Sequence, residues 1–161
     1  MSKIFDQLYL GSVADATNPQ FLKDAGITHI VNCAEECPSP FSQTISYLNL
    51  NLKDIPTQSL YHVFEPSFEY IRDNIGMGSI VLVHCAAGIS RSTSIVLYFI
   101  MKIKNVGYDQ AIAFVRSKRS IVNPNIGFKQ QLISVSPDVI GYLSTYQSHN
   151  PTETKYGTRQ I

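Results

Sequence analysis

The sequence predicts an α/β fold, a single domain with a mostly parallel central sheet flanked by helices on both faces. First, the β-branched apolar segment Ile80–Val83 ends in a loop of small residues, and an apolar stretch of helical length follows over 94–103. Second, Ser46–Leu52 alternates apolar and polar side chains, as a strand with one buried face does. Third, 161 residues suffice for one domain that buries a core without disulfides or a metal.

The remaining elements follow the same alternation of strand and helix. A short strand is expected over 5–11, and the next over 27–32. Between them, Asn18 and Pro19 are typical of a helix start and Gly26 of a residue just past a helix end. Residues 35–44, which contain two prolines, are expected to form a loop.

The second half of the chain is predicted to be mainly helical. Apolar spacing indicates helices over 59–75, from Ser92 to about 103, over 108–119, after an N-cap at Asn125, and from Ser136 to about Gln147. Phe128 and Leu132 are expected to contact the core. Residues 1–147 are therefore predicted to form the domain, and 148–161 a polar, mobile tail.

Composition excludes several classes of protein. Hydrophobic residues make up 44% and charged residues 16% of the chain, as in a soluble globular domain. A formal net charge of +1 argues against nucleic acid or an acidic membrane as a partner, so any preference for anions is local. No signal peptide, myristoylation start or apolar run of about 18 residues is present. A cytoplasmic or nuclear monomer is expected.

Cys85 lies where the central strand ends and the loop begins. A compact loop that closes onto a helix start points backbone N–H groups at one small volume, where the helix dipole adds positive charge. Such a loop binds an anion of phosphate size. Arg91 can grip two oxygens of that anion with its planar guanidinium. Because the same field lowers the pKa of a thiol from ~8.5 to roughly 3.5–7.5, Cys85 is expected to be a thiolate nucleophile.

The segment His84-Cys85-x-x-Gly88-x-x-Arg91-Ser92 resembles the loop pattern of the cysteine-dependent protein tyrosine phosphatases, and it is most similar to their dual-specificity branch. The resemblance spans about residues 4–134. It implies hydrolysis of phosphotyrosine and phosphoserine or phosphothreonine in proteins through a cysteinyl-phosphate intermediate, without a metal or cofactor. The phosphate-binding residues that it implies are Cys85, Ala86, Ala87, Gly88, Ile89, Ser90 and Arg91.

The resemblance also assigns roles outside the anion-binding residues. Asp54, in the loop after the Ser46–Leu52 strand, is in register with the family's general acid. Ser92 is expected to cap the long helix and to donate a hydrogen bond to the leaving sulfur. His84 is expected to hold the loop and to help keep the cysteine ionised. Arg119 matches a family arginine that borders the pocket, which would create a secondary anion site; a helix-ending cation that complements the dipole is the alternative.

Several alternatives stay open at this point. Cys33 and Cys37 are expected to be a buried and an exposed bystander, although either could form a disulfide with an oxidised Cys85. A phosphoinositide or RNA phosphatase could use the same loop, but Ala86 and Ala87 add no cation for a polyanionic substrate. A non-catalytic phosphoprotein-binding module is a further alternative. A cysteine protease would need a histidine base and an acyl site.

Overall fold

The computed structural model describes residues 1–137, which form a five-stranded sheet with the order β1-β2-β5-β3-β4. The edge strand β1 (Ser2–Phe5) pairs antiparallel with β2 (Leu8–Gly11). The other neighbours pair parallel, and they are β5 (Val81–His84), β3 (His29–Ala34) and β4 (Ser46–Leu52). Parallel strands end at the same edge of a sheet, so the segments that follow these strands meet there.

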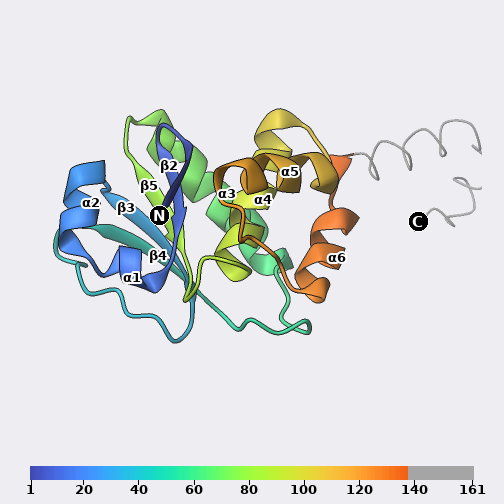
Figure 1. Ribbon diagram of the computed structural model, residues 1–161, viewed down its shortest axis with the longest axis horizontal. Helices are drawn as coiled ribbons and strands as arrows, with labels where there is room; N and C mark the ends of the chain where they lie inside the picture. Colours follow the sequence, from blue (N-terminus) through green and yellow to red (C-terminus); the bar gives the residue numbers. More distant parts are fainter. Residues whose placement is uncertain (138–161) are drawn as a thin grey trace, which may run out of the picture.

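Helices cover both faces of the sheet (Figure 1). On one face lie α1 (Val13–Ala16) and α2 (Pro19–Ala25), which pack with Ile30 and Leu82 in a small core. The other face carries a larger core under the remaining helices. These helices are α3 (Tyr61–Gly76), α4 (Arg91–Lys104), α5 (Tyr108–Lys118) and α6 (Ile126–Ser134).

The predicted fold class is confirmed, and most helices and strands begin and end close to their predicted boundaries. The strand over Ser46–Leu52 has the expected ends, and α2 has Asn18 as its N-cap and Gly26, at φ 73°, as its C-cap. The helix α4 is buried from Arg91 to Met101, as its continuous apolar sequence indicates. The helix expected from Ser136 to Gln147 and the tail over 148–161 reach beyond the described residues.

Three details near the N-terminus differ from the sequence expectation. The strand expected over 5–11 is a hairpin, because Asp6 and Gln7 form the turn between β1 and β2. This turn lacks the Asn-Gly or Asp-Gly signal of common two-residue hairpins. The helix α1 was not expected, since its four residues are too few for a periodic pattern; a capping box of Ser12 and Asp15 starts it. The strand β3 covers His29–Ala34 instead of the expected 27–32, and Ala34 at its end pairs with Leu52 of β4.

In residues 1–137, no helix combines the length and the apolar character that a membrane crossing requires.

Candidate active site

The loop from Cys85 to Ser90, here called the Cys85 loop, joins β5 to α4. Its turn depends on Gly88, which has a φ of 69°, in the left-handed region. A Cβ at this position would lie 2.6 Å from the carbonyl oxygen of Gly11, at the end of β2. Any side chain at Gly88 would therefore push the loop away from the sheet. The Ala86 carbonyl adds a second support by accepting a hydrogen bond from the Val13 amide at 3.0 Å.

The Cys85 side chain is 3% exposed and lies inside a ring of hydrogen-bond donors. Its Sγ lies 3.0 Å from Oγ of Ser92, in the first turn of α4. Burial alone would raise the pKa of the Cys85 thiol. Hydrogen bonds from the Ser92 hydroxyl and from the amides of Ser92, Gly88 and Ile89 outweigh burial, and the pKa is lowered overall. The same donors point toward the volume beside the sulfur, and binding of an anion there stays a prediction.

His84 supports the loop as a neutral residue. Its Nδ1 lies 3.2 Å from the Cys85 carbonyl oxygen, and because a carbonyl only accepts, Nδ1 carries the proton. Burial lowers the pKa of His84, so the imidazole is uncharged at neutral pH. His84 therefore fixes the backbone of Cys85, as expected. The expected help of His84 in keeping Cys85 ionised stays a prediction.

Arg91 is held at the mouth of the loop by a carboxylate that the sequence did not suggest. Its Nη1 and Nη2 donate to the two oxygens of Glu36 at 2.6 and 2.7 Å, and Nη1 also donates to the Leu52 carbonyl at 3.0 Å. These hydrogen bonds lower the pKa of Glu36 to about 2, so the pair is ionised at neutral pH. The Nε of Arg91 is buried and has no partner among the described residues. An anion in the Cys85 loop is the natural acceptor for this remaining edge of the guanidinium.

Glu36→Gln tests whether Glu36 orients Arg91 toward that anion. We expect the affinity of the loop for inorganic phosphate to fall about tenfold, the effect of losing one charge-assisted hydrogen bond. Isothermal titration with phosphate measures it, with the neighbouring exposed Glu35→Gln as the matched control. An increase in affinity would instead show that Glu36 competes with the anion for Arg91.

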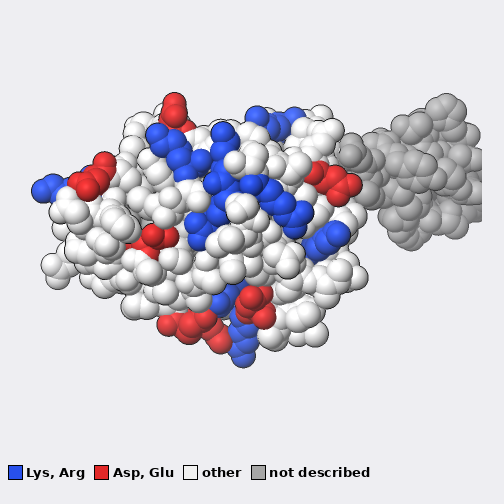
Figure 2. Space-filling model, viewed as in Figure 1, with Lys and Arg blue, Asp and Glu red and all other residues white. Residues whose placement is uncertain are grey.

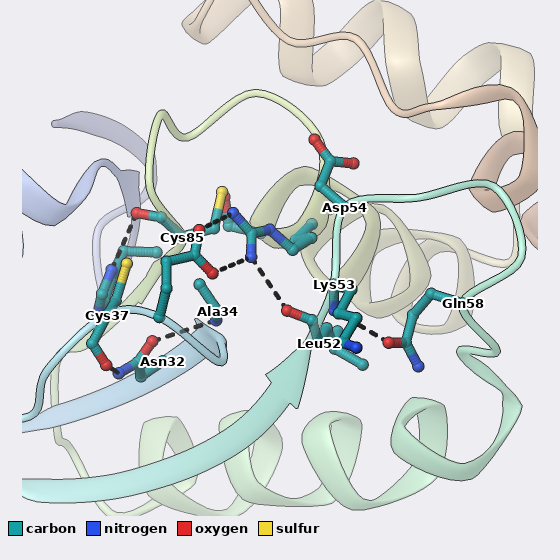
Figure 3. Close-up of polar contacts among 12 residues, drawn as sticks. Asn32, Ala34, Cys37, Leu52, Lys53, Asp54, Gln58 and Cys85 are labelled. Carbon is teal, nitrogen blue, oxygen red and sulfur yellow. Dashed lines mark hydrogen bonds and ion pairs between the residues drawn. The ribbon is translucent and has the colours of Figure 1, made fainter.

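Asp54 lies at the same edge of the sheet as Cys85, on the loop over 53–60 that follows β4 and is here called the Asp54 loop (Figure 3). Cys85 follows β5, Glu36 follows β3 and Asp54 follows β4, so three neighbouring parallel strands deliver these side chains together. The Asp54 side chain is exposed, and its Oδ1 accepts a hydrogen bond from Nδ2 of Asn125 at 2.9 Å. The role of Asp54 as general acid stays a prediction.

One expected role of Ser92 is not seen, and Arg119 makes contacts that the sequence did not suggest. Ser92 does not cap α4, because its hydroxyl bonds the sulfur; the cap residue is Ser90, whose side chain makes no capping bond. Arg119 lies on the outer side of the Cys85 loop, where its Nε and Nη2 donate to the carbonyls of Gly88 and Ala87. Its Nη1 donates to Ser2. A second anion at Arg119 would compete with these contacts, and the secondary anion site stays a prediction.

All three cysteines are free. Cys33 is buried, as expected, and burial raises the pKa of its thiol well above the ordinary value. Cys37 was expected to be exposed but is half-buried, since it packs against the larger core. A disulfide of either Cys33 or Cys37 with an oxidised Cys85 is still a hypothesis.

Sequence reasoning missed two residues that the structure brings to the site. Glu36 stands in a loop without a recognisable pattern, and its partner Arg91 is 55 positions away. Asn125 was identified as a helix cap, which it is, but its contact with Asp54 spans 71 positions. No local signal reports either contact, because both depend on how the parallel strands and α6 are placed together.

Ser92→Ala tests the origin of the thiolate. Removing the hydroxyl removes a donor that stabilises the ionised sulfur, so the pKa of Cys85 rises and less thiolate is present at a given pH. We expect the pH midpoint of Cys85 alkylation by iodoacetamide to move upward by about one unit, the size of one hydrogen bond. Ser94→Ala, whose hydroxyl bonds the Ser90 carbonyl instead, is the matched control. An unchanged midpoint would show that the Ser92 hydroxyl does not contribute to lowering the pKa of Cys85.

Comparison with known proteins gives a consistent result. Residues 8–137 match the family described as dual specificity phosphatase, catalytic domain. A probable rhodanese domain-containing dual specificity protein phosphatase of Dictyostelium discoideum is 44% identical over 80% of this chain and 27% of its own length. Dual specificity protein phosphatase 15 of Mus musculus is 34% identical over 98% of this chain and 64% of its own length. The chain thus spans less than two thirds of these relatives.

Solved structures show the same likeness. The crystal structure of DUSP15 superposes with a TM-score of 0.80 at 36% identity, covering 83% of this chain and 85% of that one. A human tyrosine phosphatase-like serine/threonine/tyrosine-interacting protein superposes with a TM-score of 0.78 at 34% identity, covering 91% of this chain and 97% of that one.

Proposed function

The chain belongs to the dual specificity phosphatase catalytic-domain family, and from this premise we propose that it hydrolyses phosphotyrosine and phosphoserine or phosphothreonine in proteins through a cysteinyl-phosphate intermediate. One observation carries the proposal. The buried sulfur of Cys85 lies within a ring of donors that lower its pKa, at the sheet edge that also presents Arg91 and Asp54. This arrangement supports the proposal that a nucleophile, an anion receptor and a proton donor act on one phosphoryl group.

In the first step, the Cys85 thiolate attacks phosphorus and forms the S–P bond while the P–O bond to the leaving group breaks. The proton goes from the Asp54 carboxyl to the leaving oxygen, which departs as a neutral alcohol or phenol. Arg91 and the amides of the Cys85 loop stabilise the charge on the three equatorial oxygens. The fixed pair with Glu36 supports this role, because it presents the guanidinium without a search over rotamers.

In the second step, the Asp54 carboxylate takes a proton from water as the water oxygen attacks phosphorus. The S–P bond breaks, inorganic phosphate forms, and the electron pair returns to sulfur. The Ser92 hydroxyl, 3.0 Å from Sγ, is placed to donate to the sulfur as its negative charge is restored. This contact supports a Ser92 role in the breakdown of the intermediate.

Charge on the surface favours an anionic substrate. Lysines and arginines gather in a band across the middle of the face shown in Figure 2, although the whole chain carries a formal charge of only +1. Such a band raises the local concentration of anions. Arg119 belongs to the basic end of α5 but turns its donors to the Cys85 loop carbonyls. The Cys85 loop itself adds no cation for a polyanion, because Ala86, Ala87 and Ile89 are apolar, and we therefore prefer a phosphomonoester in a protein over a polyanionic inositol lipid or RNA.

Phosphate release by the purified chain tests the proposal directly. We expect release from phosphotyrosine and phosphothreonine peptides and from an aryl phosphate, without added metal. Release from phosphoinositides or 5′-phosphorylated RNA alone would assign the loop to those substrates instead. Binding of phosphopeptides with no turnover of any substrate would support a phosphoprotein-binding module.

We also propose a cytoplasmic or nuclear location, where reduced thiols persist. The three free cysteines support it, since a nucleophilic Cys85 has to stay reduced.

Peptide mapping after mild peroxide tests the hypothesis that Cys33 or Cys37 forms a disulfide with an oxidised Cys85. Finding only over-oxidised Cys85 would exclude such a protective disulfide.

A further inference from the structure

The Asp54 loop is exposed along its tip. Leu52 and Leu60 are buried and anchor its two ends, whereas Asp54, Ile55 and Thr57 are exposed. Few contacts come from the loop itself, chiefly the bond from the Lys53 amide to Oε1 of Gln58 at 2.9 Å. Exposed loops of this kind move unless another element holds them. A carboxyl that has to meet a leaving oxygen needs such support, because small misplacements are costly in catalysis.

The support comes from α6, which is about 70 residues further along the chain. Oε1 of Gln131 accepts a hydrogen bond from the Leu60 amide at 2.7 Å, and its Nε2 donates to the Gln58 carbonyl at 2.9 Å. At the start of α6, Gly127 touches the Asp54 loop so closely that a Cβ would overlap the Pro56 carbonyl. The first two turns of α6 are therefore built against the backbone of the Asp54 loop.

Asn125 joins this support to the carboxyl itself. Its Oδ1 accepts from the Phe128 amide at 3.0 Å as the N-cap of α6, and this bond fixes which way the side-chain amide points. Nδ2 is thereby directed outward, and it donates to Oδ1 of Asp54 at 2.9 Å. The planar side-chain amide of Asn125 thus caps α6 through its oxygen and contacts Asp54 through its nitrogen.

The backbone of the same residue is tied to the Cys85 loop. The Asn125 amide donates to the hydroxyl of the buried Ser90 at 3.0 Å. Two positions earlier, the Asn123 amide donates to the Ile89 carbonyl at 2.9 Å. Asn125 thus contacts the nucleophile's loop through its backbone and the carboxyl through its side chain, so it sets the position of one relative to the other.

We propose that Asn125 is a positioning residue, which holds Asp54 in register with the Cys85 loop and leaves Oδ2 of Asp54 as the oxygen that carries the transferred proton. Oδ1 already accepts from Asn125, so a proton on Oδ2 is the arrangement that keeps this hydrogen bond. During the attack of the thiolate, the proton on Oδ2 moves to the leaving oxygen as the P–O bond breaks. The inference rests on the proposed phosphatase activity and adds to it how the acid is held.

Asn125→Ser is the test variant, because serine keeps a good N-cap and the backbone amide on Ser90 but is too short to reach Asp54. We expect kcat/KM for a phosphotyrosine peptide to fall about tenfold, from the loss of the hydrogen bond that holds the Asp54 carboxyl in position. For an activated aryl phosphate, whose leaving group needs no proton, the change should stay below about twofold. The inhibition constant for inorganic phosphate should not change, because the Cys85 loop keeps its contacts.

Two controls separate this role from a structural one. Asn18→Ser makes the same substitution at the N-cap of α2, where Oδ1 of Asn18 accepts from the Gln20 and Phe21 amides, and it should leave kcat/KM unchanged for both substrates. In an Asp54→Ala background, Asn125→Ser should have no further effect, since its partner is absent. An additional loss in that background, or an equal loss with both substrates, would overturn the inference. Inactivity of the unmodified chain toward all phosphate esters would instead contradict the proposed function.

Discussion

Cys85→Ser should abolish turnover while phosphopeptide binding persists. The change replaces the sulfur by a hydroxyl that is un-ionised at neutral pH, and the Cys85 loop contains no other thiol. We expect kcat to fall on the order of 10⁴-fold or more, as when the nucleophile of a catalytic set is removed. Stopped assays of phosphate release over hours would measure the residual rate.

Binding should survive because the receptor for the anion is separate from the nucleophile. Arg91, its Glu36 partner and the loop amides are unchanged, and the negative charge that a thiolate places beside a dianion is gone. Fluorescence titration with a labelled phosphopeptide should give a dissociation constant equal to or below that of the unmodified chain. Cys37→Ser, at a half-buried cysteine outside the loop, is the matched control and should keep its activity within about twofold. Residual turnover above about 1% would point to a different nucleophile.

The contrast between these residues explains what the sequence can reveal. Cys85, Gly88 and Arg91 lie within one contiguous strand, loop and helix, and each depends on local geometry such as the φ of 69° at Gly88. Local patterns predict local structure, so the strand, loop and helix around Cys85 were predictable. The strand over Ser46–Leu52 was equally clear, and it placed Asp54 at the carboxyl end of a parallel strand.

Long-range partners are different in kind. Glu36 contacts Arg91 because β3 and β5 are neighbours in the sheet. The order of strands in a sheet cannot be predicted from the pattern of any single segment. Asn125 had a complete local explanation as a cap, which concealed a second hydrogen bond through the other end of its amide. A residue with a satisfied structural role thus gives no sequence signal of a second role. The hairpin of β1 was missed for a related reason, since its pairing rests on tertiary contact rather than on turn chemistry.

Removal of the proton donor should produce a loss that depends on the leaving group. In Asp54→Ala, a phosphotyrosine peptide must release its phenolic oxygen without protonation, and we expect kcat/KM to fall about 10²- to 10⁴-fold. An activated aryl phosphate leaves as a stable anion, so its kcat/KM should fall less than about tenfold. A series of aryl phosphates of graded leaving-group pKa measures this as a steeper dependence of log kcat/KM in the variant.

Asp54→Asn makes the assignment sharper, because its amide oxygen can still accept the hydrogen bond from Asn125 while carrying no transferable proton. If Asp54 acts as the acid, both variants should show the same steep leaving-group dependence. If its role is only to anchor the loop to α6, Asp54→Asn should behave like the unmodified chain and only Asp54→Ala should be impaired. Asp24→Ala, at an exposed carboxylate on α2 that bonds Gln20, is the control for loss of a surface charge. The two Asp54 variants therefore separate proton transfer from loop position, which a single substitution would leave combined.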